Sequence, residues 1–183
     1  MSHSWPPGEF STSRLLLRKP HPADAEVQFS RLSGDAAVTR YLGWLCHASI
    51  TQTRQQISHD LLRADRGAAW TWALLQQGSA AHDVAGFLQL TRHDHVLRLG
   101  YALRQSCWGQ GLMAEAIAAV CERVFEQAWA WRLEAQCDVD NHASRRLLEK
   151  LGWCCEGRLR RGLVHPNVSS EPRDVWLYAL TRD

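Results

Sequence analysis

The feature that most constrains the fold is a junction at 108–116, where two glycines stand between a predicted strand and a predicted helix. Apolar and polar residues alternate over 97–103, as in a half-buried strand, and apolar residues recur at helical spacing after the turn. Gly109 and Gly111 let the backbone turn tightly and approach a ligand closely. The helix begins at about Leu112 and directs unpaired N–H groups at this turn. The junction therefore predicts a phosphate site.

Neither common nucleotide motif accounts for this turn. It lacks the Lys-Ser/Thr of a P-loop, and its glycines do not have the spacing of the dinucleotide-binding fingerprint. A short Gly-x-Gly by itself is also compatible with an ordinary tight turn packed against a helix. The phosphate-bearing ligand has to be identified from the rest of the chain.

The elements around the junction form a strand–helix–strand unit. The second strand is predicted at 132–139, so the two strands are expected to be parallel neighbours. Periodicity predicts the remaining strands at 14–18, 69–76, 84–92, 153–164 and 174–180, and further helices at 24–32, 51–65 and 141–151. No linker or repeat divides residues 1–183, so we expect a single α/β domain with a mixed central sheet of about seven strands flanked by helices.

Composition excludes several classes of protein. The chain has 183 residues, 45% of them hydrophobic, and no apolar run reaches membrane-spanning length, so no membrane partner is expected. A net charge of +2 gives no indication of a nucleic-acid partner. Residues 1–7 lack the pattern of a secretory signal, which predicts a cytoplasmic protein. The six cysteines show no CxxC spacing and are interpreted as reduced thiols, so neither disulfides nor a metal site are expected.

Five segments of the second half, taken in order, carry a family resemblance. The chain resembles the GNAT acetyltransferases, in particular the RimJ/RimL-like branch of ribosomal-protein N-acetyltransferases. The order and spacing of all five segments match that branch, and 13–18 with Asp24 resembles its first strand and helix. The five segments are Leu-Gly-Tyr-Ala-Leu (99–103), Trp-Gly-Gln-Gly-Leu-Met (108–113), Asp-Asn-His-Ala-Ser (140–144), Leu-Glu-Lys-Leu-Gly-Trp (148–153) and Glu-Gly (156–157).

The resemblance implies that acetyl-CoA is the phosphate-bearing ligand and that it lies where the parallel strands 97–103 and 132–139 splay apart. It also implies that the Leu103 backbone and Asn141 contact the pantetheine arm, and that Ser144 approaches the sulfur of the cofactor. From the residues alone, Asn141 is equally a helix cap. The implied pyrophosphate segment, acting through its main chain, consists of Trp108, Gly109, Gln110, Gly111, Leu112, Met113 and Ala114.

Proton transfer is where the chain departs from the wider family. The family's usual tyrosine acid is replaced by Leu148, so Ser144, a water or solvent must protonate the departing thiolate. By resemblance Glu156 is the general base, with His142 and His165 as alternatives. The competing interpretation of Glu156 is a structural carboxylate facing Arg158 or Arg160.

The sequence thus predicts an acetyl-CoA-dependent N-acetyltransferase acting on a primary amine. The acceptor is a protein or peptide N-terminus, or alternatively a small amine such as an amino acid, polyamine or aminoglycoside. A third alternative is a CoA-binding sensor without turnover, because the tyrosine is absent. Either a monomer or a homodimer is compatible with the sequence.

Overall fold

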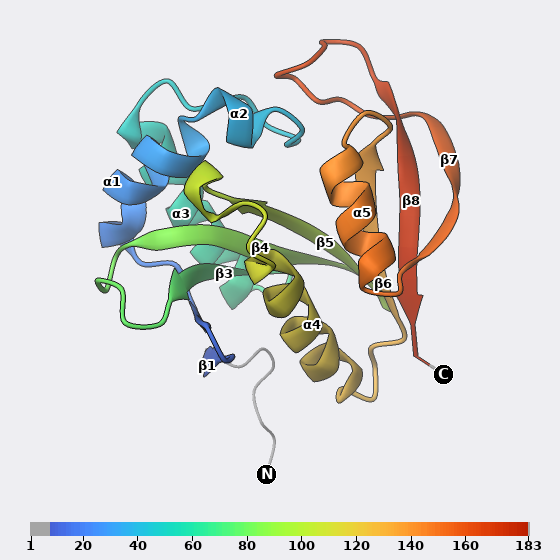
Figure 1. Ribbon diagram of the computed structural model, residues 1–183, viewed down its shortest axis with the longest axis horizontal. Coiled ribbons are helices and arrows are strands. Elements are labelled where there is room, and N and C mark those ends of the chain that lie inside the picture. Colours follow the sequence, from blue (N-terminus) through green and yellow to red (C-terminus); the bar gives the residue numbers. More distant parts are fainter. Residues whose placement is uncertain (1–7, 183) are drawn as a thin grey trace.

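The computed structural model describes residues 8–182 and consists of an eight-stranded sheet with helices on both faces (Figure 1). The predicted absence of a signal in residues 1–7 lies outside the described residues. The order of strands is β1-β2-β3-β4-β5-β6-β8-β7, and only β5 and β6 are parallel. The strands are β1 (Glu9–Ser11), β2 (Leu15–Arg18), β3 (Ala69–Gln76), β4 (Val84–His93), β5 (Val96–Leu103), β6 (Arg132–Asp138), β7 (Cys154–Leu163) and β8 (Arg173–Thr181).

The mixed α/β sheet and its parallel strand pair were correctly predicted, and the count of about seven strands was one short. The missing strand is β1, whose three residues pair with β2 at the edge of the sheet. Three residues give too short a pattern for period-two alternation to be recognised. Among the described residues, no helix is long and apolar enough to cross a membrane. The helices are α1 (Ala25–Gln28), α2 (Ala36–Thr39), α3 (Ile50–Asp65), α4 (Leu112–Phe125) and α5 (His142–Lys150).

The helix predicted at 24–32 is interrupted. After α1 the chain widens into a π-helical turn at Phe29–Ser33, where the Gly34 N–H donates to the Phe29 carbonyl at 2.9 Å. A side chain at Gly34 would lie 2.7 Å from that carbonyl, so the glycine permits the wide turn. The break lets α2 turn toward β5 and the site described below.

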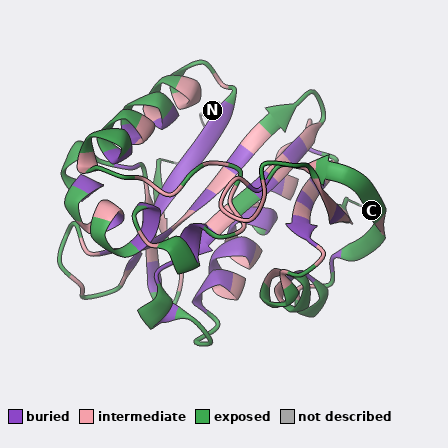
Figure 2. Ribbon diagram, turned by 90° about the horizontal axis from the view of Figure 1, so that it is seen from above, coloured by how far each residue is buried: buried purple, intermediate pink, exposed green. Residues whose placement is uncertain are grey.

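Helices α4 and α5 cover one face of the sheet, and α3 covers the other (Figures 1 and 2). The main core lies between the sheet and α4, where Leu15, Leu99, Ile117 and Val120 are buried. Figure 2 shows buried residues along the central strands and exposed ones on the outer faces of the helices and on β7. The helices and the central strands therefore form a rigid frame, and the carboxyl ends of β5 and β6 open beside it.

The two parallel strands separate halfway along their length. They pair only from Val96↔Arg132 to Leu99↔Ala135. Beyond that point β5 stays with β4 as far as Leu103, and β6 stays with β8 as far as Asp138. The predicted splay is therefore present, and each strand at the gap is held by an antiparallel neighbour on its other side.

The close approach of β4 to β5 at the splay predicts a specific effect on stability. A Cβ at Gly86 would lie 2.3 Å from the Ala102 carbonyl, whereas one at Gly100 would meet nothing within 4 Å. We expect Gly86→Ala to lower the free energy of unfolding by about 1–3 kcal/mol because it overpacks this contact. Gly100→Ala, the matched control, is expected to leave the free energy unchanged. Urea denaturation measures both, and equal stability of the two variants would contradict the close approach.

Candidate active site

A cavity of about 880 Å³ lies at the splay and extends over the start of α4 and one side of α5. Of the predicted cofactor contacts, only Gln110 is missing from its lining; the Gln110 side chain instead donates to the Ser106 carbonyl. The predicted contacts that do line the cavity are Leu103, Trp108, Gly109, Gly111, Leu112, Met113, Ala114, Asn141 and Ser144.

The turn before α4 has the conformation that its glycines predict. Gly109 and Gly111 have φ of 72° and 76°, which lie in the left-handed region. A Cβ at Gly109 would meet no atom within 4 Å, so its space opens toward the cavity. Gly111 caps the 14-residue helix α4, whose first N–H groups have no partner within the helix. This end of the cavity is therefore suited to an anion.

Arg14 brings a positive charge to the same turn. Its guanidinium donates to the Gln110 carbonyl at 2.9 Å and lies 3.6 Å from the Cβ position of Gly111. It is also paired with Glu115, whose pKa burial alone would raise, but which hydrogen bonds from Thr12 and Arg14 lower to about 2. Arg14 was not predicted as a site residue, because a contact between the β1–β2 turn and the start of α4 leaves no local signal in the sequence.

The Leu103 backbone is placed between β4 and the splay as the resemblance implies, with one difference. The Arg104 N–H bonds to Ala85 on β4, so the alternation of an antiparallel ladder directs the N–H and C=O of Leu103 the other way, into the splay. The Leu103 carbonyl accepts a hydrogen bond from the Trp108 indole at 2.7 Å. Trp108 therefore shapes the cavity through its side chain, whereas the resemblance implied a contact through its main chain alone.

Helix α5 and strand β5 each contribute one hydroxyl to the cavity. The Asn141 side chain accepts from the Ser144 N–H at 3.2 Å, so Asn141 caps the helix as well as lining the cavity. The Ser144 hydroxyl lies 2.8 Å from the Tyr101 hydroxyl, which arrives from β5. Burial raises the pKa of Tyr101 above its ordinary value, so this phenol keeps its proton at neutral pH.

Tyr101 was missed as a functional residue, because period-two alternation assigned it to the apolar face of its strand. Leu148, at the family's usual tyrosine position, is fully buried and offers no proton. Cys137 also lines the cavity, and burial raises the pKa of its thiol to about 11. A thiol that stays protonated at neutral pH is a poor nucleophile, so the cavity favours direct transfer without a cysteine intermediate.

Glu156 is not brought to the cavity. It lies on β7, and its carboxylate accepts two hydrogen bonds from Arg132, one of 2.8 Å. The guanidinium holds the pKa of Glu156 below its ordinary value, which opposes proton uptake at neutral pH. This geometry fits a structural ion pair, but its partner is Arg132 on β6 and not the expected Arg158 or Arg160; Arg158 bonds to Asp174. The role of Glu156 as a base stays a prediction without a supporting contact.

Two loops from opposite ends of the chain meet at the side of the cavity nearest α2. The Asn167 side chain donates to the carbonyls of Thr39 and Trp44, both at 2.8 Å, and accepts from the Cys46 N–H at 2.8 Å. These three bonds fasten the β7–β8 loop to the loop after α2. We call the joined segments, 39–47 and 164–169, the roof of the cavity. His165, in the roof, lines the cavity.

The charged side chains in the cavity lining are all cationic. They are Arg40, Arg98, Arg146 and Lys150, and no Asp or Glu is among the residues that line the cavity. Two other arginines near the turn or on α5 are engaged elsewhere: Arg104 with Asp83 at 2.6 Å and Arg145 with Glu149 at 2.9 Å.

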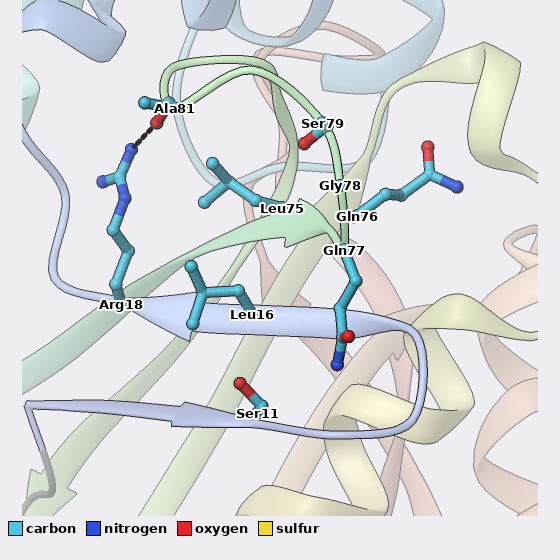
Figure 3. Close-up of a pocket in the computed structure, with 9 residues that line it drawn as sticks. All are labelled: Ser11, Leu16, Arg18, Leu75, Gln76, Gln77, Gly78, Ser79 and Ala81. Carbon is cyan, nitrogen blue, oxygen red and sulfur yellow. Dashed lines mark hydrogen bonds between the residues drawn. The ribbon is translucent and has the colours of Figure 1, made fainter.

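A second pocket lies away from the splay, between β2 and the β3–β4 turn (Figure 3). Its one charged side chain, Arg18, is bound to the Ala81 carbonyl at 2.7 Å and to Asp24. It contains no helix N-terminus and no nucleophilic pair, so the splay remains the candidate site. Among the described residues, no group of three or more His, Cys, Asp or Glu side chains is placed to hold a metal ion.

Comparison with known proteins agrees with this geometry. Residues 14–153 match the family model described as an acetyltransferase (GNAT) domain. The chain is 31% identical over 173 residues to YoaA of Bacillus subtilis (strain 168), described as an uncharacterized N-acetyltransferase, covering 93% of this chain and 95% of that protein. It is 28% identical over 187 residues to the ribosomal protein uS5-alanine N-acetyltransferase of Escherichia coli (strain K12), covering 96% and 92%.

A solved structure shows the same fold. It is RimL, a ribosomal L7/L12 alpha-N-protein acetyltransferase in complex with coenzyme A, with a TM-score of 0.82 and 22% identity. The match covers 94% of this chain and 96% of that one. The splay, the glycine turn and the family match lead to one conclusion: the chain belongs to the GNAT acetyltransferase family.

Proposed function

We propose that this N-acetyltransferase transfers the acetyl group of acetyl-CoA to the N-terminal amine of a protein or peptide. The observation that carries the proposal is the splay of β5 and β6, which opens onto a cavity bounded at one end by the glycine turn of α4. A thioester held between the strands would have its phosphates at this turn. The names of relatives that act on ribosomal proteins support a protein acceptor.

In this proposal, the cavity binds acetyl-CoA mainly through its backbone. The N–H groups at the start of α4 and the guanidinium of Arg14 hold the pyrophosphate. The N–H of Leu103 is available to the pantetheine arm, because it points away from β4 and into the splay. The Leu103 carbonyl, in contrast, is already bonded to the Trp108 indole.

The hydroxyl pair supplies the proton that the thiolate needs. Ser144 reaches the sulfur in the family pattern, and the Tyr101 hydroxyl lies 2.8 Å from the Ser144 hydroxyl, so the two can pass a proton between them. The pair thereby replaces the tyrosine acid that Leu148 cannot provide. Direct attack of the amine on the thioester carbonyl gives the amide, and coenzyme A leaves as a thiol.

The lining charge supports an acceptor that is not polycationic. Polyamines and aminoglycosides carry several positive charges and are bound by carboxylates, which the cavity lining lacks. A peptide with a single N-terminal amine, and acidic groups beyond it, meets Arg40, Arg98 and Lys150 more favourably.

The phosphate site can be tested at Gly111. Asparagine tolerates positive φ, so Gly111→Asn is expected to fold, while its side chain blocks the N–H groups at the start of α4. We expect the Kd for acetyl-CoA to rise by more than about tenfold, which corresponds to about 1.4 kcal/mol. Gly78→Asn is the matched control, because Gly78 has φ of 79° and an open surrounding but lies in the β3–β4 turn. Calorimetric titration measures both; equal affinities would refute the phosphate site.

The acceptor class can be tested by competition between amines. With acetyl-CoA as donor, thiol release should be faster on peptides with a free N-terminus than on spermidine or kanamycin, by more than about tenfold in kcat/KM. N-terminally blocked versions of the same peptides are the control and should give no release. Preference for a polyamine would contradict the proposed acceptor. Binding of acetyl-CoA without transfer to any amine would leave the sensor alternative.

The hydroxyl pair can be tested with Tyr101→Phe and Ser144→Ala. Both variants should lower kcat by about ten- to a hundredfold with an unchanged Kd for acetyl-CoA, because they remove proton donation and leave the backbone contacts. Tyr178→Phe is the matched control, since the Tyr178 hydroxyl bonds to Glu149, outside the cavity. Wild-type rates in both test variants would assign these hydroxyls to the scaffold.

A further inference from the structure

A buried histidine in the roof has no hydrogen-bonding role in the fold. His165 is 3% exposed and lines the cavity, and neither Nδ1 nor Nε2 has a hydrogen-bond partner among the described residues. Buried polar groups are nearly always paired, so two unpaired nitrogens on one ring require an explanation. The imidazole makes a T-shaped contact with the Tyr41 ring, and the two ring centroids are 6.2 Å apart. The backbone carbonyl of His165 accepts hydrogen bonds from the Val168 and Ser169 N–H groups, which fixes the turn that carries the ring.

Next to this ring lies a buried carboxylate at the end of β6. Asp138 is fully buried, and its Oδ2 lies 3.8 Å from His165 Nε2. Arg173 donates to both Asp138 oxygens, at 2.6 and 3.0 Å, and the Asp140 N–H donates to one of them at 2.9 Å. Burial alone would raise the pKa of Asp138, but these bonds lower it, so the carboxylate stays ionised.

The charged groups beside His165 belong to one bonded cluster. Asp138 and Asp140 supply two negative charges, and Arg173, bonded to both, supplies one positive charge. Tyr41 is the neighbour from the loop after α2, and the Arg40 guanidinium lies 5.4 Å from the centroid of the Tyr41 ring. The cluster of Asp138, Asp140 and Arg173 therefore places one net negative charge beside the imidazole.

We propose that His165 is the general base of the transfer and that Asp138 positions and stabilises its imidazolium form. The inference rests on the proposed function and specifies its proton path. Both requirements of a base are met. The ring lines the cavity in which the acceptor must lie, and neither ring nitrogen has a hydrogen-bond partner among the described residues, so the unprotonated nitrogen of the neutral imidazole can accept a proton. His165 was an alternative to Glu156 in the sequence, and the structure separates the two by position.

The step balances as follows. One proton of the acceptor ammonium passes to a His165 ring nitrogen, and the neutral amine nitrogen bonds to the thioester carbonyl carbon. The C–S bond breaks with its electron pair on sulfur, which takes a proton from the Ser144 and Tyr101 hydroxyls. The second ammonium proton replaces the one given to sulfur, and the imidazolium releases its proton to solvent through the cavity.

The test compares pH profiles of kcat/KM for the wild type and His165→Gln with a peptide acceptor. At pH 7 the variant should be slower by about two to three orders of magnitude, with an unchanged Kd for acetyl-CoA. The deficit should shrink as pH rises past about 8, where a free α-amino group is already neutral. A structural role for His165 would instead give a deficit that is independent of pH.

Further variants make the outcome decisive. Asp138→Asn should show a smaller deficit of the same pH shape, because the base remains but its charged form loses support. His95→Gln, in the exposed β4–β5 turn at the other end of β5, is the matched control and should match the wild type. Full activity of His165→Gln, or a pH-dependent loss in Glu156→Gln in its place, would overturn the proposal. Thermal unfolding checks that each variant is folded, and His165→Asn replaces His165→Gln if that variant unfolds.

Failure of this inference differs from failure of the proposed function. A wild type that acetylates peptides, with His165→Gln equally active at every pH, refutes only the base. A wild type that binds acetyl-CoA and acetylates no amine refutes the proposed function, and the base with it. Weaker binding of acetyl-CoA by His165→Gln would place the ring in the donor site and would also overturn its role as base.

Discussion

The separation of β5 and β6 after Leu99 and Ala135 is the constraint on which the rest of the site depends. A parallel pair that parts would normally expose unpaired backbone groups and lose stability. Here the cost is limited, because β4 and β8 each keep one side of the parting strands fully paired. The backbone groups that remain free are those directed into the gap, and they are the groups that a ligand with amide bonds can use.

The charge distribution follows from that gap. Donors of backbone hydrogen bonds and the end of the α4 dipole lie at one end, and cationic side chains line the walls. The carboxylates near the cavity do not line it. Glu115 accepts hydrogen bonds from the β1–β2 turn, and Asp138 accepts hydrogen bonds from Arg173. The site thus presents positive charge to its ligands and keeps its negative charge behind the first layer of side chains. Asp138 can act on the chemistry only through His165.

The sequence predicts the fold and the strand–turn–helix unit well, because those features are local. The glycine turn, the helix after it and the Asn141 cap each depend on residues within a few positions of one another. Residues that act through contacts between distant segments were missed or misplaced. Tyr101 looks like one more apolar residue of a strand, and Arg14 lies in the β1–β2 turn, far from α4 in the sequence. Glu156 was selected by family resemblance, and its pairing with Arg132 on β6 became visible only in three dimensions.

The roof has a consequence for how the site forms. Asn167 bonds to Thr39 across 128 residues of chain, so the loop that these bonds close includes most of the sheet. Closing so long a loop costs conformational entropy that is repaid only after the intervening strands have paired. The roof therefore depends on the pairing of the whole sheet, whereas the glycine turn depends on residues adjacent in the chain. A substitution that weakens the sheet far from the cavity would accordingly disturb the position of the imidazole before it disturbs the glycine turn.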